Sequence, residues 1–253
     1  MTKINHDSLA RTITRAGMIL IESGAETMRV EDTMNRLASA YGASVTDAYA
    51  TPTLLMISFT LNGQLVHNIK RVHIKATNLS KINAVNTLSR LACEKKLTLE
   101  ELNQQLDYIN NEKSYSSLIH LLGAAICSFG FAYFFQGGIN EALNCIWIGI
   151  VTQLIVEVFD RYHISAIFRY MISGAILTYC AILSEKFFGA DRNLVIISVI
   201  MLLVPGLAIT NAIKDSVNGD LVSGISRGTE SILIAISIAI GSGFCLVLFG
   251  GLV

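Results

Sequence analysis

The residues best suited to chemistry lie in one segment near the end of the sequence, between residues 205 and 230. The segment opens with Pro205-Gly206 and continues with polar and charged side chains. These are Asn211, Lys214, Asp215, Asp220, Ser223, Arg227 and Glu230. The first three share one helical face, and the later four share a face if the helix re-forms after residue 218. Beside a membrane, polar residues on one face are expected to line a permeation path.

In this interpretation the basic residues Lys214 and Arg227 attract carboxylates, while the acidic residues of the segment gate the path or couple to protons. A second interpretation stays open: the segment is an amphipathic loop helix in the cytoplasm with a solvated polar face. The acidic residues would then only pair with the two basic residues.

Pro205-Gly206 interrupts an otherwise continuous apolar helix. Proline removes an intrahelical hydrogen bond and glycine loosens the backbone, so the sequence predicts a break or kink there. At membrane depth a broken helix is tolerated only where it is buried in protein or lines a wet cavity. Transporters use such breaks to point half-helix N-termini at anionic substrate groups.

Two further groups of residues are candidates. Gln153 and Glu157 lie four residues apart, next to Asp160. The carboxylates Glu157 and Asp160 either couple protons to transport or mark the headgroup boundary. The second group is a predicted turn with an interfacial role, formed by Glu22, Ser23, Gly24, Glu26 and Thr27.

A hydrolytic site assembled from Glu22, Glu26, His67 and His73 is the enzymatic alternative. However, the sequence contains no nucleophile elbow, phosphate loop or metal-ligand spacing, and its five cysteines are isolated. We therefore expect no enzyme activity, no metal and no cofactor.

The distribution of charged residues divides the sequence into two regions. The elements of these two regions must position the candidate residues. Residues 1–113 carry 24 of the 38 charged side chains, and residues 114–253 carry the other 14. The net charge is zero, which indicates no nucleic-acid partner. The predicted fold is an α-helical integral membrane protein, with a cytoplasmic α+β domain over 1–113 and a transmembrane domain over 114–253.

Within 1–113, apolar periodicity predicts helices over 9–22, around Val30 to Tyr41 and over 80–95. Strands are expected over 54–61 and 64–70, joined by the hairpin signal Asn62-Gly63. Thr98 and Glu101 form a predicted capping box for a last helix.

Five stretches of the second region lack Asp, Glu, Lys and Arg: 114–140, 142–156, 170–184, 193–213 and 231–253. A bilayer core needs about 20 helical residues. We therefore expect five transmembrane helices, roughly at 117–135, 141–159, 166–184, 193–211 and 231–251. Lys and Arg in the short loops favour a cytoplasmic N-terminus by about four to two. The first residues also lack a signal-peptide core, and five spans place the C-terminus in the periplasm.

The chain resembles the threonine/serine exporter (ThrE) family through nearly its whole length. The resemblance is carried by the Ser-Gly-Ala-Glu-Thr turn at 23–27, the five helices that follow and, most specifically, the segment from Pro205 to Glu230. Matching residues there are Asn211, Asp215, Gly219-Asp220, Ser223-Gly224, Arg227 and Glu230. Single-chain exporters of the family continue into a second membrane half, so this sequence looks like the large, YjjP-type subunit of the split form.

The resemblance implies a small hydrophobic membrane partner of the YjjB type, an inner-membrane location in a bacterium, and export of succinate, the substrate associated with the split form in enteric bacteria. The need for a partner or a higher oligomer also follows physically, because a polar face left in lipid is costly. We expect a secondary transporter for a small carboxylate. Threonine/serine export, a membrane-tethered hydrolase and a membrane sensor are the alternatives.

Overall fold

The computed structural model describes residues 5–73, 77–95, 97–112 and 115–251. The chain forms two compact units. Unit 1 comprises residues 1–113 and 207–228, and unit 2 comprises 114–206 and 229–253. The structure thus groups residues 207–228 with the first unit, whereas the sequence analysis placed them in the membrane region.

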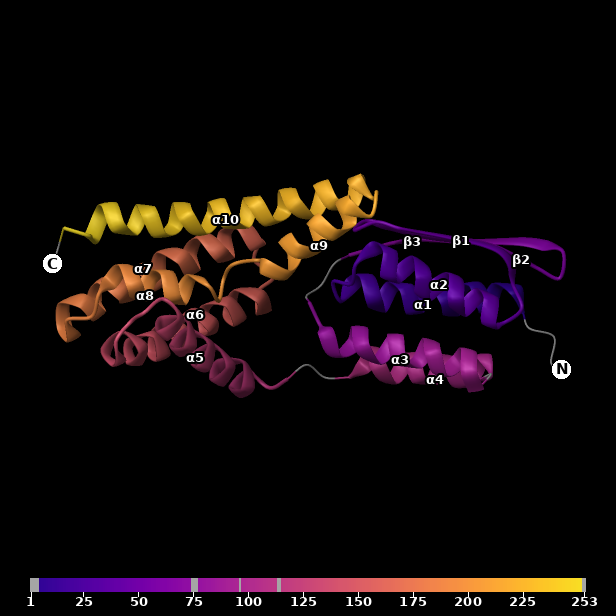
Figure 1. Ribbon diagram of the computed structural model, residues 1–253, viewed down its shortest axis with the longest axis horizontal. Helices are drawn as coiled ribbons and strands as arrows, with labels where there is room; N and C mark the ends of the chain where they lie inside the picture. Colours follow the sequence, from indigo (N-terminus) through magenta and orange to yellow (C-terminus); the bar gives the residue numbers. More distant parts are fainter. Residues whose placement is uncertain (1–4, 74–76, 96, 113–114, 252–253) are drawn as a thin grey trace. The chain divides into compact units, whose positions relative to one another are not determined.

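Unit 1 has an α+β architecture built in three layers (Figure 1). A three-stranded antiparallel sheet packs against α1 and α2, and these two helices pack in turn against α3 and α4. The elements are α1 (His6–Glu22), α2 (Thr27–Ala40), β1 (Ser44–Ala50), β2 (Leu54–Leu61), β3 (Gln64–Arg71), α3 (Leu79–Lys95) and α4 (Leu99–Asn111).

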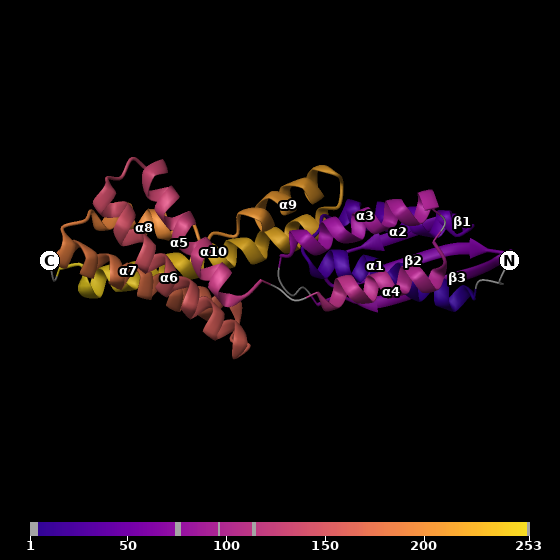
Figure 2. The ribbon, with the colours of Figure 1, turned by 90° about the horizontal axis from the view of Figure 1, so that it is seen from below.

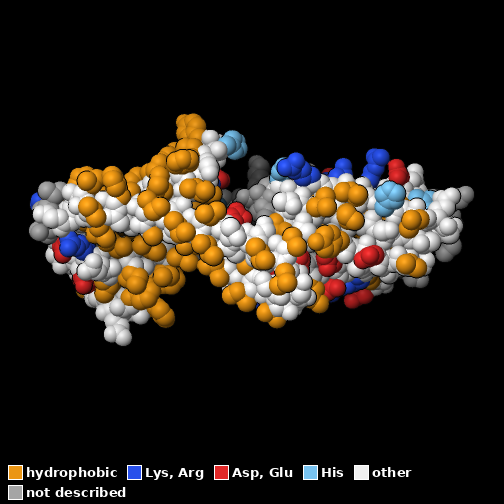
Figure 3. Space-filling model, turned by 90° about the horizontal axis from the view of Figure 1, so that it is seen from above, with side chains coloured by type: hydrophobic (Ala, Val, Ile, Leu, Met, Phe, Trp, Pro, Cys, Tyr) orange, Lys and Arg blue, Asp and Glu red, His pale blue; other side chains and the backbone are white. Residues whose placement is uncertain are grey.

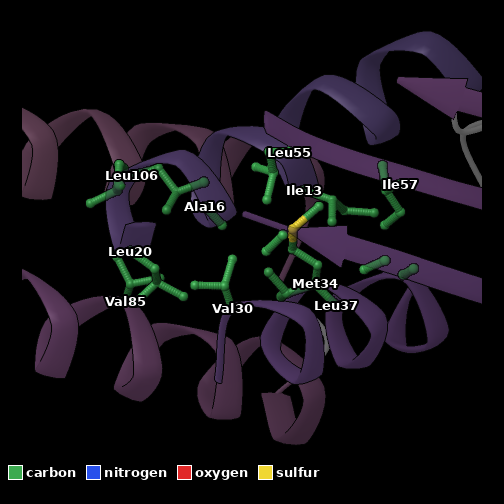
Figure 4. Close-up of a cluster of buried hydrophobic side chains, with 14 of the residues drawn as sticks. Ile13, Ala16, Leu20, Val30, Met34, Leu37, Leu55, Ile57, Val85 and Leu106 are labelled. Carbon is green, nitrogen blue, oxygen red and sulfur yellow. The ribbon is translucent and has the colours of Figure 1, made fainter. Parts of the chain in front are cut away.

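The core of unit 1 lies between these layers (Figure 4). The predicted apolar stripe of α2 is buried at Val30, Met34 and Leu37. Side chains from α1, the sheet, α3 and α4 meet this stripe, among them Ile13, Ala16, Leu20, Leu55, Ile57, Val85 and Leu106. The inner layer of helices is thus buried on two sides, which fixes the turn that joins α1 to α2.

Two local signals in unit 1 are confirmed in detail. Asn62 and Gly63 both have positive φ, as the two-residue turn between β2 and β3 requires. At α4, the Glu101 N–H donates to the Thr98 hydroxyl at 3.2 Å, and the Thr98 N–H donates to the Glu101 carboxylate at 2.8 Å. Strand β1 was not predicted from the sequence, because its residues Ser44–Ala50 alternate weakly.

Unit 2 is helical (Figure 2). Its helices are α5 (Ser117–Phe134), α6 (Ile139–Arg161), α7 (Ala166–Phe188), α8 (Arg192–Ile200) and all but the first turns of α10 (Leu221–Phe249). Helix α9 (Gly206–Val217) and residues 221–228 of α10 form the hairpin that belongs to unit 1. Of the helices described, α5, α6, α7 and α10 are long and apolar enough to cross a membrane.

The expected span over 193–211 is therefore wrong as a single helix. Helix α8 ends at Ile200 and α9 begins at Gly206, so the chain is non-helical around Pro205. The break is the one predicted, because Pro205 has no N–H to donate to an α-helical ladder. The helix of the last expected span, 231–251, begins earlier than that span, because the first turns of α10 from Leu221 belong to unit 1 and unit 2 resumes at Thr229.

The surface of unit 2 suits a lipid environment. On the face shown in Figure 3, hydrophobic side chains cover most of this unit. Large apolar residues are exposed along α5 and α10, including Leu118, Ile126, Ile232, Ile240 and Val247. An apolar exterior of this extent identifies unit 2 as a membrane region rather than a soluble domain.

Candidate functional site

The candidate site lies within unit 1, where the hairpin of α9 and α10 meets the turn between α1 and α2. Residues 22–27 are called the 22–27 turn below, and residues 207–228 are called the docked hairpin. Four predicted residues of the hairpin contact the turn: Asn211, Lys214, Asp215 and Arg227. The structure thus joins two candidate groups that lie almost 190 residues apart in the sequence.

Asp215 is the centre of this cluster and is fully buried. Its Oδ1 accepts the backbone N–H of Thr27 at 3.1 Å and the Thr27 hydroxyl at 2.9 Å. Thr27 is the first residue of α2, and the N-cap residue Glu26 makes no side-chain cap of its own. Asp215 therefore supplies, from the hairpin, the negative charge and the acceptor that a helix N-terminus favours.

Arg227 balances the buried carboxylate. Its side chain is 6% exposed, and its Nε lies 3.2 Å from Oδ2 of Asp215. One Nη donates to the carbonyl oxygen of Ala25 at 2.7 Å. Because both charges are removed from water, each depends on the other, and loss of one partner leaves an uncompensated buried charge.

Two contacts at the rim of the cluster are more exposed. The Asn211 amide donates to the carbonyl oxygen of Gly24 at 2.9 Å. The Lys214 ammonium lies 2.8 Å from the Glu26 carboxylate, with the Lys214 side chain about half exposed. Solvent weakens an ion pair of this kind, so the contact adds less to stability than the buried pair does.

Gly24 gives the turn its shape. Its φ is +82°, a conformation that residues with a Cβ rarely adopt, and a Cβ there would lie 3.2 Å from the Thr77 hydroxyl. On the other side of the turn, the carbonyl oxygen of Ser23 accepts the N–H of Asn78 at 3.0 Å. The turn is thus held from two sides, and its Gly24 and Ala25 carbonyls point at the hairpin.

A glycine also lets the two helices of the docked hairpin approach each other. A Cβ on Gly224 would collide with the Ser216 hydroxyl and lie 2.9 Å from the carbonyl oxygen of Ala212. Gly228 likewise faces Ala212. Close packing of α9 on α10 therefore explains why α10 starts before the membrane region expected for it.

The other predicted residues of the segment are placed differently. Asp220 caps α10, because its Oδ1 accepts the N–H of Ser223 at 3.1 Å. The Ser223 hydroxyl is buried and has no hydrogen-bond partner among the described residues. Glu230 is exposed and lies in unit 2, outside the cluster. Pro205 and Gly206 form the helix break.

The sequence reasoning missed Glu31, an acidic residue beside this site. Its carboxylate accepts the backbone N–H of Ala50 at 2.9 Å. Burial raises the pKa of Glu31 above its usual value, and the nearby carboxylates of Asp220, Asp32 and Asp47 raise it further. Nothing in the local sequence distinguishes Glu31 from a solvated helix residue, since Asp220 and Asp47 come from other elements and only Asp32 is its neighbour on α2.

Within unit 2, Glu157 is held by neighbours that the sequence reasoning only partly identified. It accepts hydrogen bonds from the Ser117 hydroxyl and, at 3.3 Å, from the Gln153 amide. His120 Nδ1 lies 3.4 Å from the same carboxylate. Because His120 stands on α5 and Glu157 on α6, only the fold brings this His–Glu pair together. Asp160 instead pairs with Arg169, which also stacks over the ring of Tyr170.

The residues of the enzymatic alternative are placed differently. His67 and His73 are exposed on and just after β3, whereas Glu26 is bound to Lys214. In the described part of the chain, no group of three or more His, Cys, Asp or Glu side chains is arranged to hold a metal ion.

These features define a membrane protein in which an α+β unit holds a hairpin through hydrogen bonds to a buried ion pair of that hairpin, and the second helix of the hairpin continues as a candidate membrane helix. Comparison with known proteins identifies its family. Residues 11–249 match the family described as "Putative threonine/serine exporter" (ThrE). The match covers almost the whole chain, and the protein belongs to this family of membrane exporters.

Individual relatives are distant in sequence, and the match covers nearly all of two of them and about half of a third. The chain is 19% identical to the "Probable succinate transporter subunit YjjP" of Escherichia coli, over 96% of this chain and 95% of that protein. The protein of the same description from Klebsiella aerogenes is also 19% identical, over 98% and 96%. The "Threonine/serine exporter" of Corynebacterium glutamicum is 24% identical over 90% of this chain but only 49% of its own length. No solved structure matches the chain.

Proposed function

We propose that this chain is one subunit of an inner-membrane secondary transporter that exports a small carboxylate, with succinate as its substrate, together with a small hydrophobic membrane subunit of the YjjB type. One observation carries the proposal. Residues 11–249 match the exporter family, and the two relatives named as probable succinate transporter subunits match 96% and 98% of this chain.

The membrane topology that fits this function has five crossings. Asp215 and Arg227 of the docked hairpin hydrogen-bond to Thr27 and Ala25 of the 22–27 turn, and a bilayer cannot separate groups in contact, so residues 1–113 and 207–228 lie on one side of it. The intervening stretch must then cross the membrane an even number of times. Helices α5, α6 and α7 supply three crossings, so the fourth is α8 with the non-helical residues around Pro205, and α10 is the fifth.

A crossing that is part helix and part irregular backbone is what a transport path needs. Irregular backbone survives at membrane depth only where protein or a wet cavity surrounds it, and such breaks are where transporters hold ions and substrates. We assign the substrate path to the break at Pro205-Gly206 and to the neighbouring polar residues. The N-terminal unit then lies in the cytoplasm and the C-terminus in the periplasm.

The docked hairpin supports a coupling role for the 22–27 turn. Lys214 and Arg227, the two cations expected to attract a carboxylate, are engaged by Glu26 and Asp215 in this structure. A substrate carboxylate that reached them would compete with those two acidic side chains. Substrate arrival would thereby loosen the hold of the turn on the hairpin and on α10, which continues into the membrane.

A gradient is the expected energy source, because the sequence contains no phosphate-binding loop. The pair of His120 and Glu157 is our candidate for proton coupling, since the imidazole Nδ1 lies 3.4 Å from the carboxylate, close enough for a proton to pass between them. The pair draws one member from each of two candidate spans, α5 and α6.

Threonine or serine export is the second candidate, favoured by the description of the family and by the relative from Corynebacterium glutamicum. Efflux from loaded cells separates the two substrates. Cells lacking both this chain and the small subunit would retain succinate, and only restoration of the two together would relieve the retention. Retention of threonine with unchanged succinate efflux would transfer the assignment to the amino acid.

A further inference from the structure

A groove on the surface of unit 1 has the composition of an anion site. It lies between α2 and α3, has a volume of about 300 Å³, and is lined by three arginines: Arg29, Arg36 and Arg90. Arg29 and Arg36 lie two helical turns apart on α2, and Arg90 reaches the same groove from α3. The volume is that of a small ligand site.

Two of these guanidinium groups have no acidic partner within the part of the chain that the structure describes. Among the described residues, neither Arg36 nor Arg90 forms an ion pair, whereas Arg29 lies 3.7 Å from the Glu26 carboxylate. Glu26 is itself bound to Lys214 at 2.8 Å. Asp32 is the other carboxylate lining the groove and forms no ion pair within the described residues. The lining therefore has an excess of positive charge.

Thr33 on α2 and Asn86 on α3 also line the groove. Buried Thr33 donates its hydroxyl hydrogen to the carbonyl oxygen of Arg29 at 2.8 Å, and the same hydroxyl lies 3.4 Å from the side-chain oxygen of Asn86, so the two helices are in contact at the groove. Arginine presents several N–H donors in a fixed fork that matches carboxylate and phosphate oxygens. A preformed groove with two unpaired guanidinium groups suits a ligand that carries two negative charges.

We propose that the groove between α2 and α3 binds a small dianion, a dicarboxylate or a phosphate, through Arg36 and Arg90, with Arg29 completing the site. This site is separate from the transport path assigned above and does not depend on the direction or the substrate of transport. Glu26 connects the two regions, because its carboxylate contacts both Arg29 in the groove and Lys214 in the docked hairpin.

The test is ligand binding to the purified full-length chain in detergent at low ionic strength, where exposed charges are least screened. Thermal unfolding and calorimetric titration are followed with succinate, with inorganic phosphate and with threonine, which carries no net charge. We expect saturable stabilisation by succinate or phosphate, the two probes distinguishing an organic from an inorganic ligand, and none by threonine.

Substitutions of the residues that line the groove test their roles in dianion binding. Arg36→Gln and Arg90→Gln should each weaken dianion binding about three- to tenfold, the range for partly exposed charge pairs. Asp32→Asn should strengthen it by removing the competing carboxylate. Arg11→Gln is the matched control, because Arg11 is an exposed arginine of α1 that pairs only with Asp7 and lies outside the groove.

Absence of saturable binding by both dianions, or equal binding to wild type and the double variant of Arg36 and Arg90, would overturn the proposal. Asp32→Asn keeps the test decisive if an arginine variant unfolds, since unchanged affinity in that variant would also count against the site. Failure of succinate export in cells would leave this binding result untouched, so the two proposals can fail separately.

Discussion

Breaking the buried pair of Asp215 and Arg227 is the most informative perturbation of this protein. Arg227→Gln removes the charge that faces Oδ2 of Asp215 and the guanidinium that donates to the carbonyl oxygen of Ala25. Asp215 is fully buried, so its carboxylate would remain without a counter-ion. Breaking a buried pair in this way costs about 3–5 kcal/mol, a large share of the roughly 5–15 kcal/mol that stabilises a domain.

The more exposed ion pair of Lys214 and Glu26 supplies the control for this substitution. Lys214→Gln removes an ion pair of similar length, 2.8 Å, but the Lys214 side chain is about half exposed. Exposed pairs contribute about 0–1 kcal/mol, so the two substitutions should differ by about 2–5 kcal/mol if burial decides the strength of the contact. The double variant Asp215→Asn with Arg227→Gln should recover part of the loss, because no buried charge is left unpaired.

The assay is the free energy of unfolding of the purified chain in detergent, combined with hydrogen exchange at the amide of Thr27. That amide donates to Asp215, so its exchange reports undocking of the hairpin directly. We expect faster exchange at Thr27 in Arg227→Gln and little change in Lys214→Gln. Equal, small costs for both variants, with protection of Thr27 retained, would refute the claim that the buried pair holds the hairpin.

Three further predictions follow from single contacts. Gly224→Ala should destabilise unit 1 by about 1–3 kcal/mol in a thermal unfolding assay, because the added Cβ would collide with the Ser216 hydroxyl. The control is Gly243→Ala, whose added Cβ would meet open space and which should be neutral or slightly stabilising in the same assay. Thr98→Ala should cost about 1 kcal/mol by removing the cap of α4, measured by chemical denaturation. The pKa of Glu31 is raised in the folded state, so the folded protein binds this proton more tightly than the unfolded chain does. The free energy of unfolding should therefore fall as pH rises from about 4.5 through the folded pKa. Glu31→Gln should flatten that part of the pH profile, and an unchanged profile would contradict the assignment.

Local signals in the sequence predicted local structure well. Asn62-Gly63 predicted a hairpin because both residues tolerate positive φ. Thr98 and Glu101 predicted a helix start because the side chain of each accepts a hydrogen bond from the backbone N–H of the other. Pro205-Gly206 predicted the break between α8 and α9 for an equally local reason. In each case the atoms that decide the structure lie within a few residues of one another.

The docking of the hairpin could not be predicted in the same way. Asp215 lies on a helix with a polar face. The sequence of such a face has the same pattern whether the face contacts water, a transport path or another element of the protein. Its partner Thr27 is 188 residues earlier, and no local pattern links the two. The pairing of His120 with Glu157 and the convergence of Arg36 with Arg90 were missed for the same reason, since each depends on the packing of two helices.

The most direct test of the central claim is succinate transport by purified protein in proteoliposomes. This chain, the small membrane subunit and the two together are reconstituted separately, and movement of labelled succinate and of labelled threonine is followed down an imposed concentration gradient. The account predicts succinate movement only when both chains are present, with unlabelled succinate competing. Succinate movement by either chain alone, or threonine movement without succinate movement by the pair, would contradict it.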